Sequence, residues 1–314
     1  MKYRIGIDLG GTNMAAGIVD ETYAVPFRKS IKTRKDGTPE EIADDMAALV
    51  HELCSESGID EGDIETVGIG IPGSVSNDGI VEDANNIGFY YVPFERMMQD
   101  RLTMPVQTVN DARAAAMGEY LAGAGRGSHT FQMLTIGTGI GGAFIVNGQV
   151  LAGCNGAAGE IGHMVIRQEG IPCNCGRKGC LEAYASASAL KERMMHIVPE
   201  RQDSLLFRLC EGKKERLSGK LLFAALKEQD ALAEELFTEH IEYLAEGIAN
   251  LINALQPDML CIGGGMSEQG EALLGPLRKA VAEKIYSKHS KVQTELKAAE
   301  LGNAAGIIGA AYCR

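Results

Sequence analysis

Apolar residues near the N-terminus alternate with polar residues and glycine in a pattern that predicts two short strands joined by a glycine turn. This pattern spans residues 3–20. A similar strand, glycine turn and strand are predicted at residues 133–150, where Asn147-Gly148 is a typical hairpin sequence. Two similar units so far apart in the chain indicate a duplicated α/β fold with two domains.

Helical and strand periodicities fill the chain around these two units. Residues 39–57 place apolar side chains every three or four positions, which predicts an amphipathic helix packed on a core. Asn110 stands where a helix N-cap belongs, directly after a short apolar strand. Further strands are predicted at 66–71, 106–109 and 259–262, and further helices at 112–122, 181–197, a segment that ends before Pro257, and 304–312.

The segment between Glu160 and Glu182 holds four side chains of the kinds that bind metal. His163 lies upstream of three closely spaced cysteines, namely Cys173, Cys175 and Cys180. One imidazole and three thiolates form the ligand set that Zn²⁺ takes in closed structural sites, which leave no position open for metal catalysis. A metal there would also fix the two flanking glutamates, and rigid carboxylates suit a hydroxyl-rich ligand. The alternative is three buried cysteines beside a core histidine.

The same segment resembles the double signature of the ROK family, which groups bacterial sugar kinases with sugar-responsive repressors. Its first part is Glu160-x-Gly-His163, and its second part is Cys173-x-Cys-Gly-x-x-Gly-Cys-x-Glu182. The resemblance covers nearly the whole chain, and the glucokinase branch fits it best. One departure is Pro172, since a glycine usually precedes the first cysteine. The resemblance implies a homodimer or homotetramer that binds a sugar, ATP, Mg²⁺ and structural Zn²⁺.

Composition narrows the classes of partner. Thirty basic and 42 acidic residues give a net charge of −12, which repels nucleic acids and anionic membranes. Eight cysteines are scattered apart from the one cluster, unlike the framework of a secreted disulfide-rich domain, so we expect a reducing cytoplasm. No segment approaches a membrane span of about 20 apolar residues. We therefore expect a small-molecule partner, with no nucleic acid and no membrane.

Two glycine-rich segments match the G-x-G-x-x-G pattern of dinucleotide sites, but their contexts exclude that function. The pattern requires a helix directly after the loop, so that the helix N-terminus meets the pyrophosphate. Strand residues follow 137–142 instead, and 68–73 contains a proline. The chain also lacks a glycine-lysine pair with the spacing of a Walker loop. Nucleotide binding therefore needs another geometry.

An actin/hexokinase-like (ribonuclease H-like) ATPase fold supplies that geometry. In this fold, two hairpins from two domains face each other across a cleft, and their backbone N–H groups hold the phosphates. Asp8, beside the first turn, is predicted to orient Mg²⁺ or its bound water. The alternative for any single turn is an ordinary tight hairpin. The predicted phosphate-binding residues are Gly10, Gly11, Thr12, Thr138 and Gly139, and the resemblance places Gly263, Gly264 and Gly265 beside the adenosine.

The two hairpins also predict the domain organisation. Residues 1–118 are expected to form an N-terminal α/β domain, which the C-terminal helix at 302–314 joins. Residues 119–301 are expected to form a C-terminal α/β domain with the zinc-binding loop.

Asp111 is the candidate general base, because phosphoryl transfer to a hydroxyl needs positioning, charge neutralisation and one proton acceptor. It lies between a predicted strand and a predicted helix, and it resembles the catalytic aspartate in the family's Asn-Asp-Ala segment. The alternative is an aspartate that only satisfies the helix start. The predicted sugar-binding residues are Asn110, Asp111, Glu160, His163 and Glu182, to which the resemblance adds Gly73 and Asn86.

These residues, together with the resemblance to the ROK family, predict an ATP-dependent hexokinase that phosphorylates a hexose at the 6-hydroxyl, and the resemblance to glucokinases implies the conversion of glucose to glucose 6-phosphate. Kinases for N-acetylmannosamine, N-acetylglucosamine, allose or fructose are alternatives, because the family shares its recognition residues among epimers. A sugar-sensing repressor would need a DNA-binding domain ahead of the first hairpin, and the acidic charge opposes DNA binding. A non-catalytic sugar-binding protein would not need Asp8, Thr12 and Asp111 together.

Overall fold

The computed structural model describes residues 2–313, and their packing groups them into two compact units. The first unit comprises the chain up to Met133, Gly142–Gly159 and the chain from Ala299 onward, and the second comprises Leu134–Gly141 and Glu160–Ala298. The domain limits predicted from the sequence stay a prediction.

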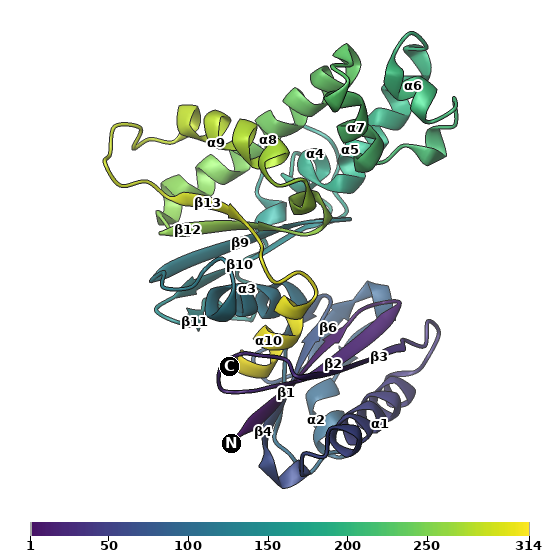
Figure 1. The fold of residues 1–314 in the computed structure, drawn as a ribbon, viewed down its shortest axis with the longest axis vertical. Helices are drawn as coiled ribbons and strands as arrows, with labels where there is room; N and C mark the ends of the chain where they lie inside the picture. The colour runs from purple at the N-terminus through teal and green to yellow at the C-terminus, as the bar shows by residue number, and fades with distance from the viewer. Residues whose placement is uncertain (1, 314) are drawn as a thin grey trace. The chain divides into compact units, whose positions relative to one another are not determined.

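The strands fall into three sheets (Figure 1). Their bounds are β1 Tyr3–Leu9, β2 Asn13–Val19, β3 Phe27–Lys32, β4 Ile64–Ile71, β5 Ser74–Val75, β6 Val81–Ala84, β7 Phe89–Val92, β8 Val106–Asn110, β9 Thr130–Ile136, β10 Ile140–Val146, β11 Gln149–Val150, β12 Met259–Gly263 and β13 Glu295–Ala298. The sheet orders are β3-β2-β1-β4-β8, β11-β10-β9-β12-β13 and β5-β6-β7. Both predicted strand, turn and strand units are confirmed, and Asn147 and Gly148 have the positive φ angles, 51° and 79°, of a tight hairpin.

The α-helices lie mainly in the second half of the chain. Their bounds are α1 Pro39–Ser57, α2 Phe94–Gln99, α3 Asp111–Ala122, α4 Glu182–Ala185, α5 Ala187–Ile197, α6 Leu205–Leu209, α7 Gly219–Lys227, α8 Ala231–Leu255, α9 Glu271–Lys284 and α10 Ala304–Tyr312. Short 3₁₀ turns include η2 Asn85–Ile87, η3 Ile161–His163 and η6 Gly265–Gln269.

Alternation along the strands of the first unit gives its five-stranded sheet two different faces. One face carries large apolar side chains, including Ile5, Ile7 and Ile69, and packs in one core with α1 and α2. The other face carries Gly6 and Gly68 at positions where α10 packs (Figure 1). The sheet is therefore covered by helices on both sides.

Glycine at those positions is what allows α10 to approach the sheet. A Cβ on Gly6 would lie 1.8 Å from the Ile307 carbonyl oxygen, and a Cβ on Gly68 would lie 1.7 Å from that of Ala310. The same close packing joins α10 to α3, since a Cβ on Gly309 would lie 1.6 Å from the Ala114 carbonyl oxygen. Distances this short exclude any side chain, so α10 can lie this close to β1 and β4 only because these positions are glycine.

Strands β1, β4 and β8 run parallel, so their carboxyl ends meet at one edge of the sheet. Asp8 pairs with Gly70, and Gly70 pairs with Val109. Asn110, the last residue of β8, pairs with Ile71. Adjacent strands lie about 4.8 Å apart, so the backbones at Asp8 and Val109 are about 10 Å apart.

The second unit places helices α4, α5 and α7–α9 with strands β12 and β13. The 25-residue α8 is the predicted long helix, and it ends at Leu255. Its C-cap is Gln256, whose φ of 45° is left-handed, directly before Pro257. The single helix predicted at 181–197 is wrong, because the chain forms α4 and α5 in its place. Ser186 breaks it with an extended ψ of 160°, and its hydroxyl accepts a hydrogen bond from the Ala189 N–H to begin α5.

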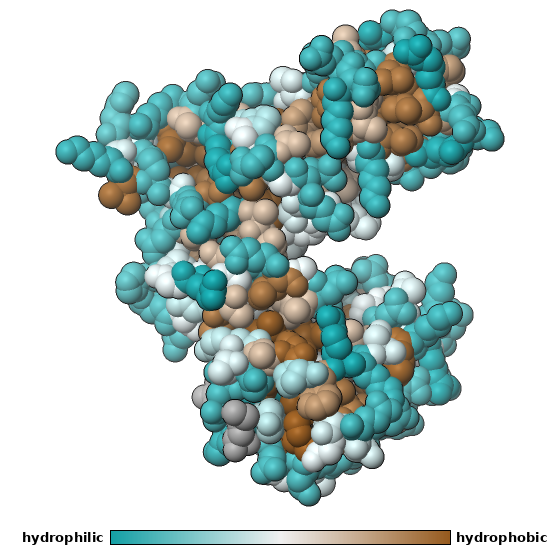
Figure 2. Space-filling model, in the orientation of Figure 1, coloured by the Kyte–Doolittle hydropathy of each residue, from teal (hydrophilic) through white to brown (hydrophobic). Residues whose placement is uncertain are grey.

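Hydrophilic side chains cover much of the face shown in Figure 2, interrupted by smaller apolar areas. Within residues 2–313, none of the helices combines the length and the apolar character that a membrane crossing requires.

Candidate active site and metal cluster

The first glycine turn lies directly after Asp8 at the carboxyl end of β1. The turn is closed by a hydrogen bond of 3.0 Å from the Gly10 N–H to the Asn13 carbonyl oxygen. Thr33 holds its outer side, since the Thr33 hydroxyl donates to the Gly10 carbonyl oxygen at 2.7 Å. A Cβ on Gly11 would lie 3.2 Å from the carbonyl oxygen of Asn86, so the predicted phosphate turn and one predicted sugar residue are neighbours.

Asp8 is held in a confined position against α10. A Cβ on Gly306 would lie 3.1 Å from the Asp8 carboxylate, so the absence of a side chain there leaves room for the carboxylate. Burial raises the pKa of Asp8 above its usual value, because desolvation disfavours the charged form. A divalent cation beside the carboxylate would oppose this effect and favour the ionised form.

Asn110 organises the junction between β8 and α3. Its Oδ1 accepts from the Arg113 N–H at 3.1 Å, which confirms Asn110 as the N-cap. Its Nδ2 donates to the Gly73 carbonyl oxygen at 2.9 Å and to Asp111 Oδ1 at 3.1 Å. Asp111 Oδ1 also accepts from the Ala112 N–H at 2.7 Å. The carboxylate of Asp111 is therefore oriented by two donors, while a different residue caps the helix.

The small sheet β5-β6-β7, which the sequence pattern did not predict, positions the other two predicted sugar residues of the first unit. Gly73, with a φ of 105°, precedes β5, and a Cβ there would lie 2.1 Å from the Asp83 carbonyl oxygen in β6. Only glycine fits that place. Asn86 lies in η2, between β6 and β7. Gly73, Asn86, Asn110 and Asp111 are thus brought together with Asp8 in one unit.

In the second unit, Glu182 is joined to the second glycine turn. Its Oε2 accepts from the Ile140 N–H at 2.8 Å. A Cβ on Gly139 would lie 2.3 Å from the same oxygen, so glycine is needed for the contact. The contact links a predicted sugar residue to the predicted phosphate residues Thr138 and Gly139. No local sequence pattern indicates this contact.

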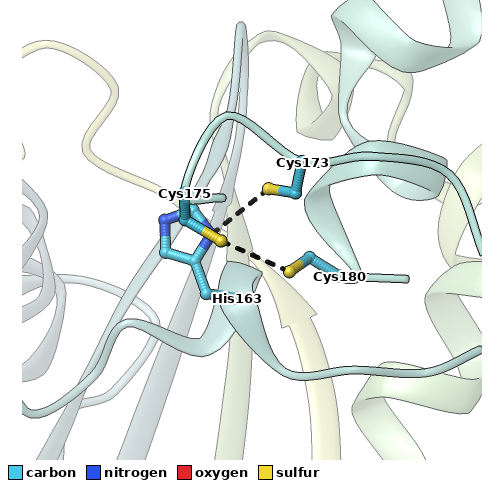
Figure 3. Close-up of side chains that lie close together, drawn as sticks. All are labelled: His163, Cys173, Cys175 and Cys180. Carbon is cyan, nitrogen blue, oxygen red and sulfur yellow. Dashed lines mark hydrogen bonds between the residues drawn. The ribbon is translucent and has the colours of Figure 1, made fainter. Parts of the chain in front are cut away.

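The four predicted metal ligands converge in the second unit (Figure 3). Their ligand atoms all lie within 4.8 Å of one another. His163 Nδ1 lies 3.6 Å from Cys173 Sγ, and Cys175 Sγ lies 3.6 Å from Cys180 Sγ. A tetrahedral zinc ion with Zn–S bonds of about 2.3 Å and a Zn–N bond of about 2.05 Å separates its ligand atoms by about 3.6–3.8 Å. The geometry of the cluster therefore fits zinc.

The thiols of the cluster differ in their surroundings. The backbone N–H of Arg177 lowers the pKa of Cys175, whereas burial raises the pKa of Cys180 to about 12. Since metal ligation requires thiolates, a bound cation is what would favour the ionised form of Cys180. The loop itself is ordered by backbone hydrogen bonds, including those of 2.8 Å from Cys173 N–H to Arg177 O and 3.0 Å from Gly176 N–H to Cys173 O.

The remaining predicted residues of the second unit lie at the ends of short elements. Glu160 precedes η3, its side chain is exposed, and its carbonyl oxygen accepts from the His163 N–H at 3.1 Å. Gly263 ends β12, and η6 begins at Gly265. Gly264 between them has a φ of 82°, and a Cβ there would lie 2.3 Å from the Ile136 carbonyl oxygen.

Comparison with known proteins identifies the family. A sequence model of the ROK family matches residues 4–313. The chain belongs to the ROK family. A glucokinase from Halalkalibacterium halodurans is 35% identical to this ROK chain over 313 residues, which are 99% of this chain and 94% of that protein.

Solved ROK structures share the fold. A ROK family glucokinase from Streptomyces griseus, in complex with glucose and AMPPNP, has a TM-score of 0.80 and 35% identity over 98% of each chain. A ROK hexokinase from Thermus thermophilus has a TM-score of 0.83 and 31% identity over 98% of this chain and 96% of that chain. These neighbours confirm the predicted duplicated α/β fold of actin/hexokinase type.

Proposed function

We propose that this ROK chain transfers the γ-phosphoryl group of ATP to the 6-hydroxyl of a hexose, with glucose as the preferred acceptor. The observation that carries the proposal is the sheet edge that holds Asp8 and Asp111. The backbones at this edge are about 10 Å apart between β1 and β8. One carboxylate adjoins a glycine turn, and the other is oriented beside Asn110. Glucokinase relatives that match 98–99% of the chain support the same function.

Asp111 is the proposed general base. Its carboxylate is held by the Ala112 N–H and by Asn110 Nδ2, so it need not move to meet a hydroxyl. The proton of the 6-hydroxyl passes to Asp111 as the hydroxyl oxygen bonds to the γ-phosphorus and the bond between the γ-phosphorus and ADP breaks. Asn110 fixes both the carboxylate and the Gly73 carbonyl, so one side chain aligns the base with the proposed sugar site.

The phosphates are the proposed ligands of the two glycine turns. Gly10, Gly11 and Thr12 would supply backbone N–H groups in the first unit, and Thr138 and Gly139 would supply them in the second. Asp8 would hold Mg²⁺ or its bound water, and that ion neutralises phosphate charge when bound. Gly263, Gly264 and Gly265 are proposed to border the adenosine, where the lack of side chains permits close approach.

The proposed sugar contacts are polar. Carboxylates and amides both bind hydroxyl groups well, because carboxylates accept hydrogen bonds and amides also donate them. In the second unit, Glu182 is already oriented by the Ile140 N–H. The proposed hexose ligands are Gly73, Asn86, Asn110, Asp111, Glu160, His163 and Glu182.

A structural zinc ion is the proposed occupant of the cluster formed by His163, Cys173, Cys175 and Cys180. Support comes from the two separations of 3.6 Å, which match a tetrahedral site. With Nδ1 on the metal, the other ring nitrogen of His163 would be a donor for a sugar hydroxyl. The metal itself would take no part in phosphoryl transfer.

The setting of the protein is also part of the proposal. We infer a cytoplasmic enzyme, because none of the eight cysteines, all of which lie within residues 2–313, forms a disulfide, and reduced cysteines persist in reducing compartments. We also infer a homodimer or homotetramer, and the domain organisation expected from the sequence, from the family resemblance.

The experiment that tests the function is coupled-enzyme turnover with ATP across a panel of sugars. We expect the highest kcat/KM for glucose. A higher kcat/KM for N-acetylmannosamine, N-acetylglucosamine, allose or fructose would change the proposed substrate but not the proposed kinase activity. A protein that binds sugar without turnover would be a sugar-sensing relative, and the kinase proposal would then be wrong.

A further inference from the structure

Arg113 occupies a position that is unfavourable for an arginine on two counts. It lies in the first turn of α3, two residues after Asp111, where the helix dipole disfavours a cation. It is also buried, with 7% of its surface exposed, and a buried guanidinium is costly unless its donors are satisfied. An arginine kept at such a place needs a compensating interaction.

Three backbone carbonyl groups supply that interaction. Arg113 Nη2 lies 2.6 Å from the Gly156 oxygen, 2.9 Å from the Ala158 oxygen and 3.2 Å from the Ala152 oxygen. Nη2 carries two hydrogens, so at least one of them is shared between two acceptors. All three carbonyls belong to residues 151–159, the segment that runs directly into Glu160.

Few other hydrogen bonds define the shape of this segment: Leu151 N–H donates to Phe144 O at 2.9 Å, Ala157 N–H donates to Asn155 Oδ1 at 3.2 Å, and one further bond closes the loop. Gly153, Gly156 and Gly159 have φ angles of 80°, 81° and 97°, and glycine loses more conformational freedom on ordering than other residues do. One backbone hydrogen bond of 3.0 Å, from Ala158 N–H to Ala152 O, closes the loop. The buried charge of Arg113 is therefore a major constraint on it.

The constraint also reaches the small sheet that positions Gly73. A Cβ on Gly156 would lie 2.6 Å from the carbonyl oxygen of Val75 in β5, so the loop is packed against that strand. Gly73 accepts the hydrogen bond of Asn110, which caps the helix that carries Arg113. The start of α3, the strand after Gly73 and the loop before Glu160 thus form one connected arrangement within the first unit.

We propose that Arg113 is a positioning residue for sugar binding, which acts by fixing residues 151–159 and so the point from which Glu160 projects. The inference rests on the proposed function, since it takes Glu160 as a sugar ligand. Arg113 makes no contact with substrate in this proposal. Its loss therefore weakens sugar binding more than it weakens ATP binding or slows the bound complex.

The test compares Arg113→Met, which keeps the length but removes the donors, with Arg113→Lys, which keeps a charge and three donors. Arg96→Met is the matched control, because Arg96 is exposed on α2 of the same unit. For Arg113→Met we expect the calorimetric Kd for glucose and the KM for glucose to rise about tenfold or more, with the KM for ATP changed less than about threefold. Arg113→Lys should recover part of the loss, and the control should match wild type.

Hydrogen exchange gives a second readout that needs no activity. Backbone amides of 151–160 should exchange several-fold faster in Arg113→Met, while those of α1 keep their protection. Unchanged exchange in this segment, or equal losses of glucose and ATP binding with general loss of protection, would overturn the proposal. If Arg113→Met does not fold, the same criteria apply to Arg113→Lys.

The calorimetric arm separates this proposal from the proposed function. A wild-type protein that binds glucose without phosphorylating it would refute the kinase but leave the role of Arg113 to be decided by the Kd values. A wild-type protein that neither binds nor phosphorylates any hexose of the panel would overturn both.

Discussion

Replacing Asp111 with asparagine isolates the proposed proton transfer from the architecture that surrounds it. Asp111 Oδ1 accepts from the Ala112 N–H at 2.7 Å and from Asn110 Nδ2 at 3.1 Å. Because both partners are donors, the carbonyl oxygen of the new amide must take the Oδ1 position. The amide nitrogen then takes the position of the other carboxylate oxygen, where it can only donate. The substitution keeps the local hydrogen bonds and removes the base.

The expected loss follows from the size of general base catalysis. Removal of a positioned base lowers kcat by about 10²–10⁴-fold, which is about 3–5 kcal/mol of transition-state stabilisation. The KM for the sugar should change less than about fivefold, because the amide still offers polar contacts to a hydroxyl. Melting temperature should stay close to that of wild type, since the cap of α3 belongs to Asn110.

The assay is steady-state coupled turnover of Asp111→Asn with saturating ATP and varied glucose, with Asp100→Asn as a control. Asp100 is exposed at the end of α2 in the same unit. A kcat for Asp111→Asn within about threefold of wild type would refute the reasoning and leave Asp111 as a residue that only satisfies the helix start.

Three further outcomes are expected. Native protein should contain one zinc ion per chain. Cys175→Ser should lose the zinc and unfold at a lower temperature, whereas Cys154→Ser, which lies outside the cluster, should keep it. Elemental analysis that finds no zinc in active native protein would contradict this prediction. Glu182→Gln should raise the Kd for glucose more than the Kd for ATP. The reason is that the glutamine amide still accepts a hydrogen bond from the Ile140 N–H but lacks the negative charge of the carboxylate. Equal changes in the two Kd values would contradict a sugar contact. Asp8→Asn should lose Mg²⁺-dependent turnover yet unfold at a higher temperature than wild type in magnesium-free buffer at pH 7. The sign follows from the raised pKa of Asp8. The wild-type protein is more stable below the unfolded-state pKa of about 4 and loses that stability as pH rises through the folded-state pKa. The difference in unfolding temperature between the variant and the wild type should therefore shrink toward pH 4.

Features that depend on a few neighbouring residues were predictable from the sequence. The hairpin at Asn147-Gly148 requires positive φ at two successive residues, and that sequence is suited to it. Asn110 was assigned as a cap from its position alone, and its side chain makes the expected bond. The cysteine and histidine spacing likewise predicted a cluster that the fold forms.

The helix predicted at 181–197 shows where such reasoning fails. Its apolar spacing continues through Ser186, so periodicity alone gives no reason to stop. The chain breaks there because Ser186 begins a new helix with its own hydroxyl, while Leu181 and Tyr184 before it are buried in the core. Serine both tolerates a helix and caps one, and tertiary packing decides between the two.

The sequence by itself determined the local chemistry of this protein: the glycine turns, the metal-binding side chains, the capped start of α3 and the candidate base. Each of these follows from backbone conformation or spacing within about twenty residues. Only the tertiary structure decided which distant partners these groups meet. The Glu182 carboxylate accepts a hydrogen bond from the Ile140 N–H, and α10 packs against the glycines of β1 and β4. The Arg113 guanidinium donates to three carbonyls of a loop about forty residues away. The reason is that backbone donors and acceptors are the same at every residue, so a sequence cannot show which of them a buried charge will select until packing has brought one set within reach.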